Sequence, residues 1–597
     1  MLQNLVIGLA GSGGDGVVSA GESLIATAAR QGYRAMLTKS FGSQIRGGEA
    51  CCRLRVSTGP VLNPGGELTV AVVLNWEDFM RFGPELPIGA ETAVIHEAKF
   101  GPPPAGAPIG LGLSSVVRAV PVEAIALAAA GTDQAKNSVV LGLMAGWFGF
   151  DPDGIREGIR KRFGYKGDDV LRANERAFSA GLVHAQADSL GERWKLAPPV
   201  PASTRRVVCD GNDLCAAAAL FAGCKFFGGY PITPATEIMQ IMQKKIWKHG
   251  GSLLQAEDEI AGIGAAIGAS FAGRKAMTAT SGPGLSLMAE MLGLASAAEL
   301  PLVCVDVQRG GPSTGMPTKR EQSDLFAAAF SSHGDTVRPI LAPMDVADTY
   351  GVTVEAFNIA ETYQTPVIVL SDQEIAQRKE VIDVVDTTGL RLVDRLAPTD
   401  AELAAYTRFR FTDSGISAIS HPGMKGGGYL AAGIEHDESG APNSNGTMHA
   451  RMSEKRLRKL DPLQRRRDLF FIEGDPEAAL GLVSWGSVAG IALEAVRAAR
   501  AEGIAVKLLV PKLIYPVATE IYEEFFAPLQ LCLVVEQSQQ GQLHRLLRMW
   551  TTVPEEFISL TRCGANPIAP QDLLEQIRSL VKTAGVVHPR ATVPLRP

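Results

Sequence analysis

One pattern recurs along this chain and restricts its fold more than any other feature. An apolar strand runs directly into a glycine-rich or polar loop, and a helix of small residues follows. The first such strand, Leu5–Ala10, leads into Gly11–Gly16 and an alanine-rich helix to about Arg30. A later one, Leu302–Val307, is followed shortly by Arg309. This alternation is typical of α/β domains built on a largely parallel sheet. Ligands bind such sheets at the carboxyl ends of the strands, so polar residues there are site candidates.

The length and composition indicate several domains. A chain of 597 residues is too long for one core, and we expect three or four domains joined by linkers. The 57 basic side chains do not exceed the 63 acidic ones, which argues against nucleic-acid binding. No apolar run reaches the roughly 18 to 20 residues of a membrane helix, and Met1–Leu5 does not resemble a signal peptide. We therefore expect a cytoplasmic protein.

Metal ligands are not grouped in this sequence. None of the eight cysteines forms a Cys-x-x-Cys pair or an iron–sulfur run. The nine histidines lack the spacing of a zinc site. The sequence thus predicts neither a bound metal nor a cluster in this chain.

The first glycine-rich loop allows two interpretations. Gly11, Gly13 and Gly16 open a βαβ beginning and fit the dinucleotide fingerprint, but the acidic residue expected about 20 positions later is missing from Ala35–Lys39. A tight turn or another kind of phosphate contact is therefore favoured over nicotinamide binding. A second polar loop, Ser40–Glu49, is either functional or a solvated hairpin.

Three short segments between residues 228 and 315 combine rigidity with polarity. In Tyr230–Pro234 two prolines flank Thr233 and stiffen the loop that presents it, although a simple helix start has the same spacing. Glu257–Glu259 precedes the helix Ile260–Ala269, and acids at a helix start often serve only as caps. The third segment, Arg309–Gly315, follows the carboxyl end of a buried strand, where ligands bind, but an exposed glycine-rich loop would read the same way.

The helix Ile260–Ala269 is also unusual in its own right. It contains so many glycines and alanines that a neighbouring helix or subunit is expected to pack closely against it.

Composition shifts divide the chain into five parts. We predict domains at 1–192, 206–385 and 475–597, a proline-rich linker at 193–205, and a charged, glycine-rich segment at 386–474. The last of these is a solvated connector or a long ordered arm that wraps a neighbouring subunit.

The whole chain resembles the alpha subunit of 2-oxoacid:ferredoxin oxidoreductases in the form that carries a gamma domain fused ahead of it. The resemblance covers the Gly11–Gly16 loop, Gly42-x-x-x-Arg46-Gly47-Gly48, Tyr230–Pro234, Glu259, Arg309–Thr318, Gly415–Ser417, His421–Gly423, Glu435–Glu438, Lys455–Arg456, Glu536–Ser538 and Gly541–Leu543. It implies an α/β fold with a gamma-like domain first, a pyrimidine-type thiamine-diphosphate-binding domain second and a transketolase C-terminal-like domain last.

The resemblance also implies a reaction. The family uses thiamine diphosphate, coenzyme A and an iron–sulfur cluster to split 2-oxoacids into acyl-CoA and carbon dioxide, and some members run the reverse carboxylation. The chain is thus expected to be an oxidoreductase of EC class 1.2.7, serving the TCA cycle or carbon fixation.

Individual roles follow from the same resemblance. Thiamine needs one buried acid at N1′ of its aminopyrimidine. Glu259 stands where the family's glutamate does, with Glu257 and Asp258 as rivals. Cofactor contacts are expected at Thr233, Glu259 and Pro231. Substrate contacts are expected at Arg309, Thr318, Thr233, Ser43 and Arg46.

A partner subunit is expected because this chain lacks part of the site. Thiamine enzymes bind magnesium through Gly-Asp-Gly and an asparagine some 25 to 30 residues later, but residues 38–50, after Gly14–Gly16, contain none. The diphosphate, Mg²⁺ and [4Fe-4S] cluster are then expected in a beta subunit that faces the small-residue helix, in an (alpha–beta)₂ heterotetramer that reduces ferredoxin.

Several functional alternatives remain at this stage. The gamma–alpha fusion favours 2-oxoglutarate, with pyruvate or branched-chain 2-oxoacids as alternatives. A lipoamide-type thiamine dehydrogenase would share the acid but would not need the gamma-like domain. A non-catalytic nucleotide-binding regulator built on Gly11–Gly16 is the remaining hypothesis.

Overall fold

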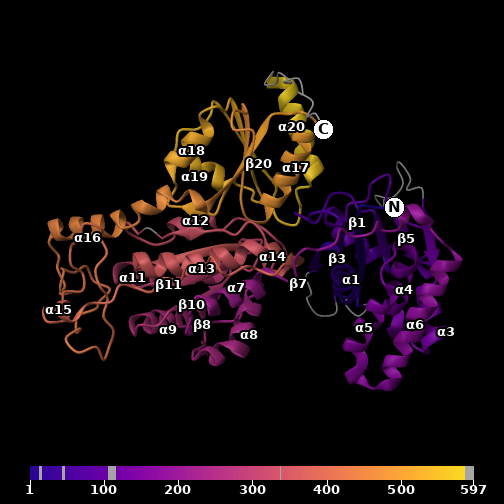
Figure 1. The fold of residues 1–597 in the computed structure, drawn as a ribbon, viewed down its shortest axis with the longest axis horizontal. Helices are drawn as coiled ribbons and strands as arrows, with labels where there is room; N and C mark the ends of the chain where they lie inside the picture. The colour runs from indigo at the N-terminus through magenta and orange to yellow at the C-terminus, as the bar shows by residue number, and fades with distance from the viewer. Residues whose placement is uncertain (13–15, 43–47, 105–115, 337, 585–597) are drawn as a thin grey trace. The chain divides into compact units, whose positions relative to one another are not determined.

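The computed structural model describes residues 1–12, 16–42, 48–104, 116–336 and 338–584. Within these ranges the chain forms three sheets of eight, seven and five strands, with helices packed on them (Figure 1). The α/β class predicted from the sequence is therefore confirmed. The chain separates into two compact units. Unit 1 comprises residues 1–210, 377–385 and 565–569, and unit 2 comprises the remainder.

Unit 1 is built on the eight-stranded sheet, whose order is β6-β5-β4-β1-β3-β2-β14-β7. Its strands are β1 (Asn4–Ser12), β2 (Arg34–Phe41), β3 (Glu49–Ser57), β4 (Val70–Val73), β5 (Ala93–Glu97), β6 (Val117–Val120), β7 (Arg206–Cys209) and β14 (Lys379–Asp383). Its helices are α1 (Val17–Gln31), α2 (Trp76–Phe82), α3 (Val122–Ala130), α4 (Lys136–Phe148), α5 (Pro152–Phe163) and α6 (Asp168–Ala187).

The βαβ beginning expected at the N-terminus is present in an interrupted form. Strand β1 pairs in parallel with β4 but antiparallel with β3, and β3 pairs antiparallel with β2. Strands β1 and β2 therefore run in the same direction with β3 between them. A dinucleotide-binding unit has those two strands side by side, so this pairing weakens the fingerprint interpretation further. Part of the glycine-rich loop, residues 13–15, lies outside the described residues.

Two strands near the expected domain boundaries belong to the first sheet. Strand β14 pairs with both β2 and β7, although the sequence placed both β7 and β14 within a domain at 206–385. Side chains reinforce the pairing, because Arg34 donates a hydrogen bond to the Asp383 carboxylate and Arg206 lies 3.5 Å from its other oxygen. Such short strands do not reveal in sequence which sheet they join.

Unit 2 begins with the seven-stranded sheet, whose order is β18-β12-β13-β11-β10-β8-β9. All of its pairs are parallel except β12 with β18. The strands are β8 (Phe226–Gly229), β9 (Ser252–Gln255), β10 (Ala276–Thr280), β11 (Leu302–Gln308), β12 (Ile340–Leu341), β13 (Pro366–Asp372) and β18 (Leu513–Tyr515). The helices are α7 (Gly211–Phe221), α8 (Thr236–Lys245), α9 (Glu259–Phe271), α10 (Gly282–Leu287), α11 (Ala289–Ala297), α12 (Leu325–Phe330), α13 (Val346–Tyr363) and α14 (Gln373–Gln377).

The small residues of α9 serve close packing inside unit 2. A Cβ on Gly262 would come within 2.9 Å of the Gly229 Cα, and a Cβ on Gly228 would come within 2.4 Å of the Gly262 carbonyl oxygen. Strand β8 is thus one close neighbour, and helix α11 is another, since a Cβ on Gly264 would lie 3.1 Å from Cε of Met291. At Gly268, by contrast, a Cβ would meet nothing within 4 Å among the described residues.

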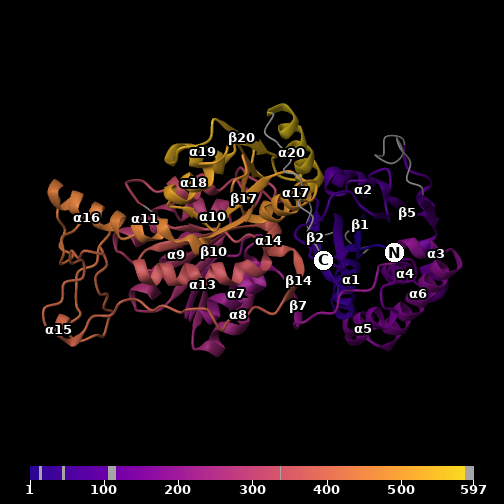
Figure 2. The same cartoon turned by 45° about the horizontal axis from the view of Figure 1, so that its top comes forward.

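The segment from 386 to 469 forms open loops with two helices, α15 (Asp400–Leu403) and α16 (Gly446–Arg458), as Figures 1 and 2 show. It is an ordered arm. A buried ionic cluster fastens it to the chain just before β11, where Glu299 accepts hydrogen bonds from Lys455 and, at 2.9 Å, from Lys459. All three side chains are almost completely inaccessible to solvent.

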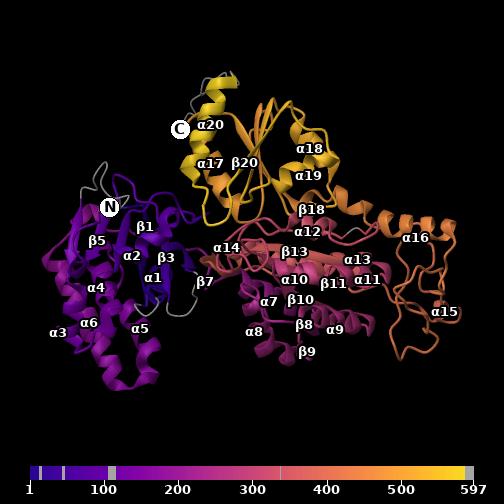
Figure 3. The same ribbon diagram turned by 180° about the vertical axis from the view of Figure 1, so that it is seen from behind.

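The last part of unit 2 contains the five-stranded sheet, in the order β15-β17-β16-β19-β20. Figure 3 shows α17 and α20 on one side of it and α18 and α19 on the other. The strands are β15 (Phe470–Gly474), β16 (Leu480–Ser484), β17 (Val506–Pro511), β19 (Leu531–Glu536) and β20 (Glu556–Thr561). The helices are α17 (Ala489–Ala501), α18 (Thr519–Phe526), α19 (Gln542–Trp550) and α20 (Pro570–Ala584). None of the helices in the described ranges combines the length and apolar character needed to cross a membrane.

Candidate active site

A hollow of about 830 Å³ lies at the carboxyl end of β11 in unit 2. Its walls come from the segment 309–324, the start of α10, and residues 539–542 and 563–564 of the C-terminal part. This is the edge of a parallel sheet at which α/β domains bind ligands. The hollow is therefore the candidate active site.

The segment 309–324 is held from both sides. Within it, the Met316 amide donates to the Gly310 carbonyl at 2.8 Å, and the Gly310 amide donates to the Lys319 carbonyl at 2.9 Å. Gln322 connects this segment to the C-terminal sheet. Its backbone amide donates to the backbone carbonyl of Gln537 at 2.7 Å, and its side-chain amide donates to the backbone carbonyl of Trp485 at 2.8 Å. These contacts fix the backbone on which the candidate site depends, and sequence reasoning did not single out Gln322.

Arg309 lies on this hollow and is 6% exposed. Its Nη1 donates a hydrogen bond to the carbonyl oxygen of Thr233, so the structure brings together two residues that the sequence singled out separately. Its Nε is buried without a partner among the described residues. Burial lowers the pKa of the guanidinium, and the charges of Asp324 and Asp306 oppose that shift. Arg309 therefore still has donors available for an anionic ligand.

The loop that carries Thr233 is anchored at its far end. Pro234 is buried, and its carbonyl accepts a hydrogen bond from the Asn212 side chain at 2.9 Å. Thr233 and Pro231 are half-buried, and helix α8 starts directly afterwards. The bonds from Asn212 and Arg309 hold the loop from two sides.

The three neighbouring acids at the start of α9 occupy three different environments. Glu257 is exposed, whereas the side chain of Asp258 caps the helix by accepting from the Ala261 amide at 2.7 Å. Glu259 is buried, at 6% exposure, and has no hydrogen-bond or ion-pair partner among the described residues. A Cβ on Gly284 would lie 2.9 Å from its Oε1, so a glycine keeps space beside the carboxylate.

The structure does not place the remaining predicted site residues on the wall of the hollow. Thr318 is half-buried in the segment 309–324, outside the set of residues that line the hollow. Ser43 and Arg46 lie outside the described residues.

Sequence reasoning missed a set of buried polar groups behind Arg309. Asp306 is completely buried in β11, and neither of its carboxylate oxygens has a hydrogen-bond partner among the described residues. The same holds for Oδ2 of Asp324 and for the hydroxyls of Thr278 and Ser281. The available signal was the aspartate itself, an acid within the otherwise apolar run Leu302–Val307.

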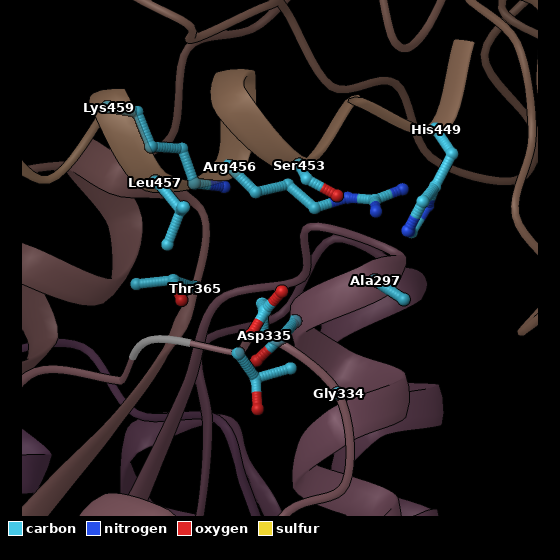
Figure 4. A pocket seen from close by; sticks show the side chains of 11 residues that line it. Ala297, Gly334, Asp335, Thr365, His449, Ser453, Arg456, Leu457 and Lys459 are labelled. Atoms are coloured by element: carbon cyan, nitrogen blue, oxygen red, sulfur yellow. The ribbon is translucent and has the colours of Figure 1, made fainter. Parts of the chain in front are cut away.

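A smaller hollow of about 200 Å³ lies between α16 and the end of α11. Figure 4 shows Arg456, His449 and Lys459 on its α16 side. These side chains already have partners, because Arg456 and His449 both bond to Glu435 and Lys459 bonds to Glu299. This hollow belongs to the attachment of the arm rather than to the candidate active site.

Two family models match separate parts of the chain. Residues 217–455 match a model described as pyruvate flavodoxin/ferredoxin oxidoreductase, thiamine diphosphate-binding. Residues 6–183 match a model described as pyruvate ferredoxin/flavodoxin oxidoreductase. Both descriptions are of oxidoreductases, and the first match spans Glu259 and Arg309.

Individual proteins are similar over greater lengths. The 2-oxoglutarate synthase subunit KorA of Methanothermobacter marburgensis is 37% identical over 63% of this chain and all of its own length. The 2-oxoglutarate oxidoreductase subunit KorA of Mycobacterium tuberculosis is 33% identical over 84% of this chain and 81% of its own length. A solved 2-oxoglutarate:ferredoxin oxidoreductase from Magnetococcus marinus, with 2-oxoglutarate, coenzyme A and succinyl-CoA bound, is 36% identical. It matches 97% of this chain and 100% of its own, with a TM-score of 0.90.

The chain therefore belongs to the 2-oxoacid:ferredoxin oxidoreductase family, as an alpha subunit. The resemblance, the enzyme class and the thiamine diphosphate dependence predicted from the sequence are confirmed. Because its relatives are named as subunits, the chain works together with other subunits.

Proposed function

We propose that the chain is the alpha subunit of an enzyme that converts 2-oxoglutarate, CoA and oxidised ferredoxin into succinyl-CoA, carbon dioxide and reduced ferredoxin. The observation that carries this proposal is the match over 97% of the chain to a structure that holds 2-oxoglutarate, coenzyme A and succinyl-CoA. Pyruvate and branched-chain 2-oxoacids are the alternative substrates.

Glu259 is the residue we assign to the proton of the cofactor. Bound thiamine diphosphate supplies the nucleophilic carbon that attacks the keto group. The surroundings of Glu259 fit its aminopyrimidine, because the residue is only 6% exposed, its carboxylate has no partner among the described residues, and Gly284 leaves space beside it. Glu259 would hold and return the proton at N1′. Thr233 and Pro231 would contact the same cofactor from the α8 side.

Arg309 is the residue we assign to the substrate carboxylate. A guanidinium forms two parallel hydrogen bonds with a carboxylate, and the bond from Nη1 to Thr233 orients the group without neutralising its charge. Thr318 would support the substrate from the same segment, and Thr233 would face the reacting carbon. The assignment of Ser43 and Arg46 to substrate rests on the family resemblance alone.

The proposed partner is a beta subunit that carries Mg²⁺, the diphosphate-binding motif and a [4Fe-4S] cluster, in an (alpha–beta)₂ complex that reduces ferredoxin. Apolar side chains on the elements that carry the site support a partner surface there. Between 40% and 50% of each of these side chains is exposed: Tyr230, Leu254, Ile260 and Leu287. Exposed apolar groups that gather beside a site mark an interaction surface.

We also retain the five-part division as a functional proposal: a gamma-like domain at 1–192, a linker at 193–205, a pyrimidine-binding domain at 206–385, an arm at 386–474 and a transketolase-like domain at 475–597.

The proposed compartment is the cytoplasm. All eight cysteines are free thiols, as is usual where disulfides are kept reduced.

The test is steady-state activity of the alpha chain co-expressed with its beta partner, using ferredoxin as acceptor. We expect a higher kcat/KM for 2-oxoglutarate than for pyruvate or a branched-chain 2-oxoacid. A preference for pyruvate would overturn the substrate assignment. Co-purification with a lipoyl acyltransferase in place of a brown, cluster-bearing subunit would overturn the reaction class.

A further inference from the structure

Two buried glutamines join the candidate active site to the C-terminal sheet. Gln322 lies in the segment 309–324, Gln537 directly follows β19, and each is 1% exposed. Their contact is reciprocal. The backbone amide of Gln322 donates to the backbone carbonyl of Gln537 at 2.7 Å, and the backbone amide of Gln537 donates to the side-chain oxygen of Gln322 at 2.8 Å. Buried polar contacts that are satisfied in this way hold two segments in one register.

The side chain of Gln537 extends this connection to the wall of the hollow. Its Nε2 donates to the backbone carbonyl of Arg562 at 3.1 Å and to that of Cys563 at 2.8 Å. Cys563 and Gly564 line the hollow, as Arg309 does. A glutamine amide has two donors, and here both hold the backbone of the segment 562–564.

The segment 562–564 packs against the segment that carries Arg309. A Cβ on Gly564 would lie 3.0 Å from the Arg320 carbonyl oxygen and 3.2 Å from Cε of Met316. The same Cε would lie 2.9 Å from a Cβ on Gly310, the residue after Arg309. The Met316 methyl group therefore contacts both the segment 562–564 and the backbone next to Arg309. Because packed interiors transmit displacements, a shift of 562–564 moves this backbone as well.

Glu321 joins the same two segments at a second point. Its carboxylate accepts hydrogen bonds from the backbone amides of Gly311 and Gly564. The Oε2 atom would lie 3.1 Å from a Cβ on Gly564 and 3.4 Å from a Cβ on Gly310. One carboxylate, which is 7% exposed as a residue, thus holds the loop after Arg309 against the segment 562–564.

We propose that Gln322 and Gln537 are positioning residues for the 2-oxoacid, and that they hold Arg309 where it binds the substrate carboxylate. This role rests on the one assigned to Arg309 under the proposed function. Gln537 acts through the segment 562–564, and Gln322 acts through the segment 309–324 that contains it. Neither glutamine lines the hollow, so both act through other residues rather than on the substrate itself. The C-terminal sheet then sets substrate affinity as well as forming part of the wall.

The experiment compares Gln537→Met with wild type in the reconstituted complex and measures kcat and the KM values for the 2-oxoacid and for ferredoxin. Methionine has a similar length and volume but donates no hydrogen bond to the segment 562–564. We expect KM for the 2-oxoacid to rise by roughly tenfold, the factor that corresponds to about one lost neutral hydrogen bond. The KM for ferredoxin should not change, and kcat should stay within about threefold, because the loss concerns substrate binding rather than the chemical step.

The matched control is Gln364→Met. Gln364 is also completely buried, and its side chain donates to the Ser417 carbonyl at 2.7 Å, but this bond attaches the arm. We expect the control to unfold at a lower temperature than wild type while both KM values stay the same. A loss of stability alone is thereby separated from a loss of substrate positioning.

A double-mutant cycle tests whether the effect passes through Arg309. KM for the 2-oxoacid is measured for Gln537→Met, for Arg309→Lys and for the two combined. If Gln537 acts by positioning Arg309, adding Gln537→Met to Arg309→Lys should raise KM by much less than it does in wild type. Two effects that multiply in full would overturn the proposal, as would a wild-type KM for the 2-oxoacid in Gln537→Met.

A second variant keeps the proposal testable if Gln537→Met does not assemble. Gly564→Ala adds a methyl group that meets Arg320 and Met316 from the same segment, and it should also raise KM for the 2-oxoacid. An unchanged KM in Gly564→Ala would overturn the proposal.

Failure of the proposed function has a different signature. A wild-type complex that oxidises pyruvate but not 2-oxoglutarate would overturn the substrate assignment alone, and the same series on pyruvate would test the two glutamines. An unchanged KM in Arg309→Lys would overturn the role of Arg309, and with it the positioning role that depends on it.

Discussion

A single position in the chain separates a capping acid from a buried one at the start of α9. The side chain of Asp258 turns back to bond the Ala261 amide, which is the usual role of an N-cap residue. Glu259, the first residue of the helix, points into the interior beside Gly284, whereas Glu257 remains in solvent. Of the three acids, only Glu259 is therefore buried as a residue.

Replacing this carboxylate tests its role directly. Glu259→Gln preserves shape and burial but cannot exchange a proton, and we expect kcat of the reconstituted complex to fall by about 10² to 10⁴-fold. The matched control is Glu257→Gln, two residues away and exposed, which should retain activity. Steady-state 2-oxoacid oxidation with ferredoxin is the measurement. Near-normal turnover of Glu259→Gln would show that another group does this work.

The fork geometry of Arg309 leads to a separate prediction. Arg309→Lys keeps the positive charge but loses the planar pair of donors and the bond to Thr233. Loss of a charge-assisted hydrogen bond costs about 1.5–3 kcal/mol, so KM for the 2-oxoacid should rise by roughly 10- to 150-fold. A lysine variant with an unchanged KM would remove Arg309 from the substrate site.

At the scale of elements, the contact between α9 and β8 holds the start of α9, and with it Glu259, in place. The backbone of the helix approaches the strand so closely that Gly262 and Gly228 have no room for a side chain. Close approach of this kind requires glycine on both elements. The same helix carries Gly268, which faces open space.

These two glycines form a matched pair for measuring the contact. Gly262→Ala should destabilise the chain by about 1–3 kcal/mol, because the added methyl group meets the backbone of Gly229. Gly268→Ala has room and should be neutral or stabilising by up to about 1 kcal/mol, since alanine favours the helix. Urea unfolding of both variants is the measurement. Equal effects would mean that helix propensity, not packing, decides stability here.

The sequence allowed part of this site to be predicted and concealed another part. The acids before α9 and the Thr233 loop could be marked because a helix start or a proline-bounded turn is encoded by neighbouring residues, whereas the choice of Glu259 among those acids came from the family resemblance. The bond from Arg309 to Thr233 and the burial of Asp306 depend on segments brought together only by folding. The pairing of β14 with β2 was hidden for the same reason. Local patterns thus marked the segments of the site, the family resemblance selected Glu259 and Arg309 within them, and neither revealed the charges around Arg309.

At the scale of the whole molecule, one buried acid holds together segments that are far apart in the chain. Glu299 lies just before β11, and the arm supplies Lys455, Lys459 and Arg408, the last of which donates to the Glu299 carbonyl at 2.7 Å. The arm is thus fixed by charge as well as by apolar contacts.

Removing the Glu299 carboxylate should lower the free energy of unfolding far more than removing an exposed carboxylate. Glu299→Gln leaves two buried ammonium groups without a counter-charge, and we expect a loss of about 3–5 kcal/mol in the free energy of unfolding. The control is Glu473→Gln, which breaks a partly exposed pair with Arg497 and should cost less than about 1 kcal/mol. Urea unfolding distinguishes the two, and similar losses would show that the buried cluster is not a special anchor.

The same acid should affect how stability depends on pH. Burial alone would raise the pKa of Glu299, but the charges of Lys459, Lys455 and Arg408 outweigh it and hold the pKa well below its ordinary value. A lowered folded-state pKa means that the stabilisation is present above the unfolded pKa of about 4.3 and is lost as the pH falls below it. Glu299→Gln lacks this titration. Its free energy of unfolding should therefore fall less steeply than that of the wild type between about pH 5 and 3. Parallel acid-unfolding curves for the two proteins would show that Glu299 is not ionised in the folded chain.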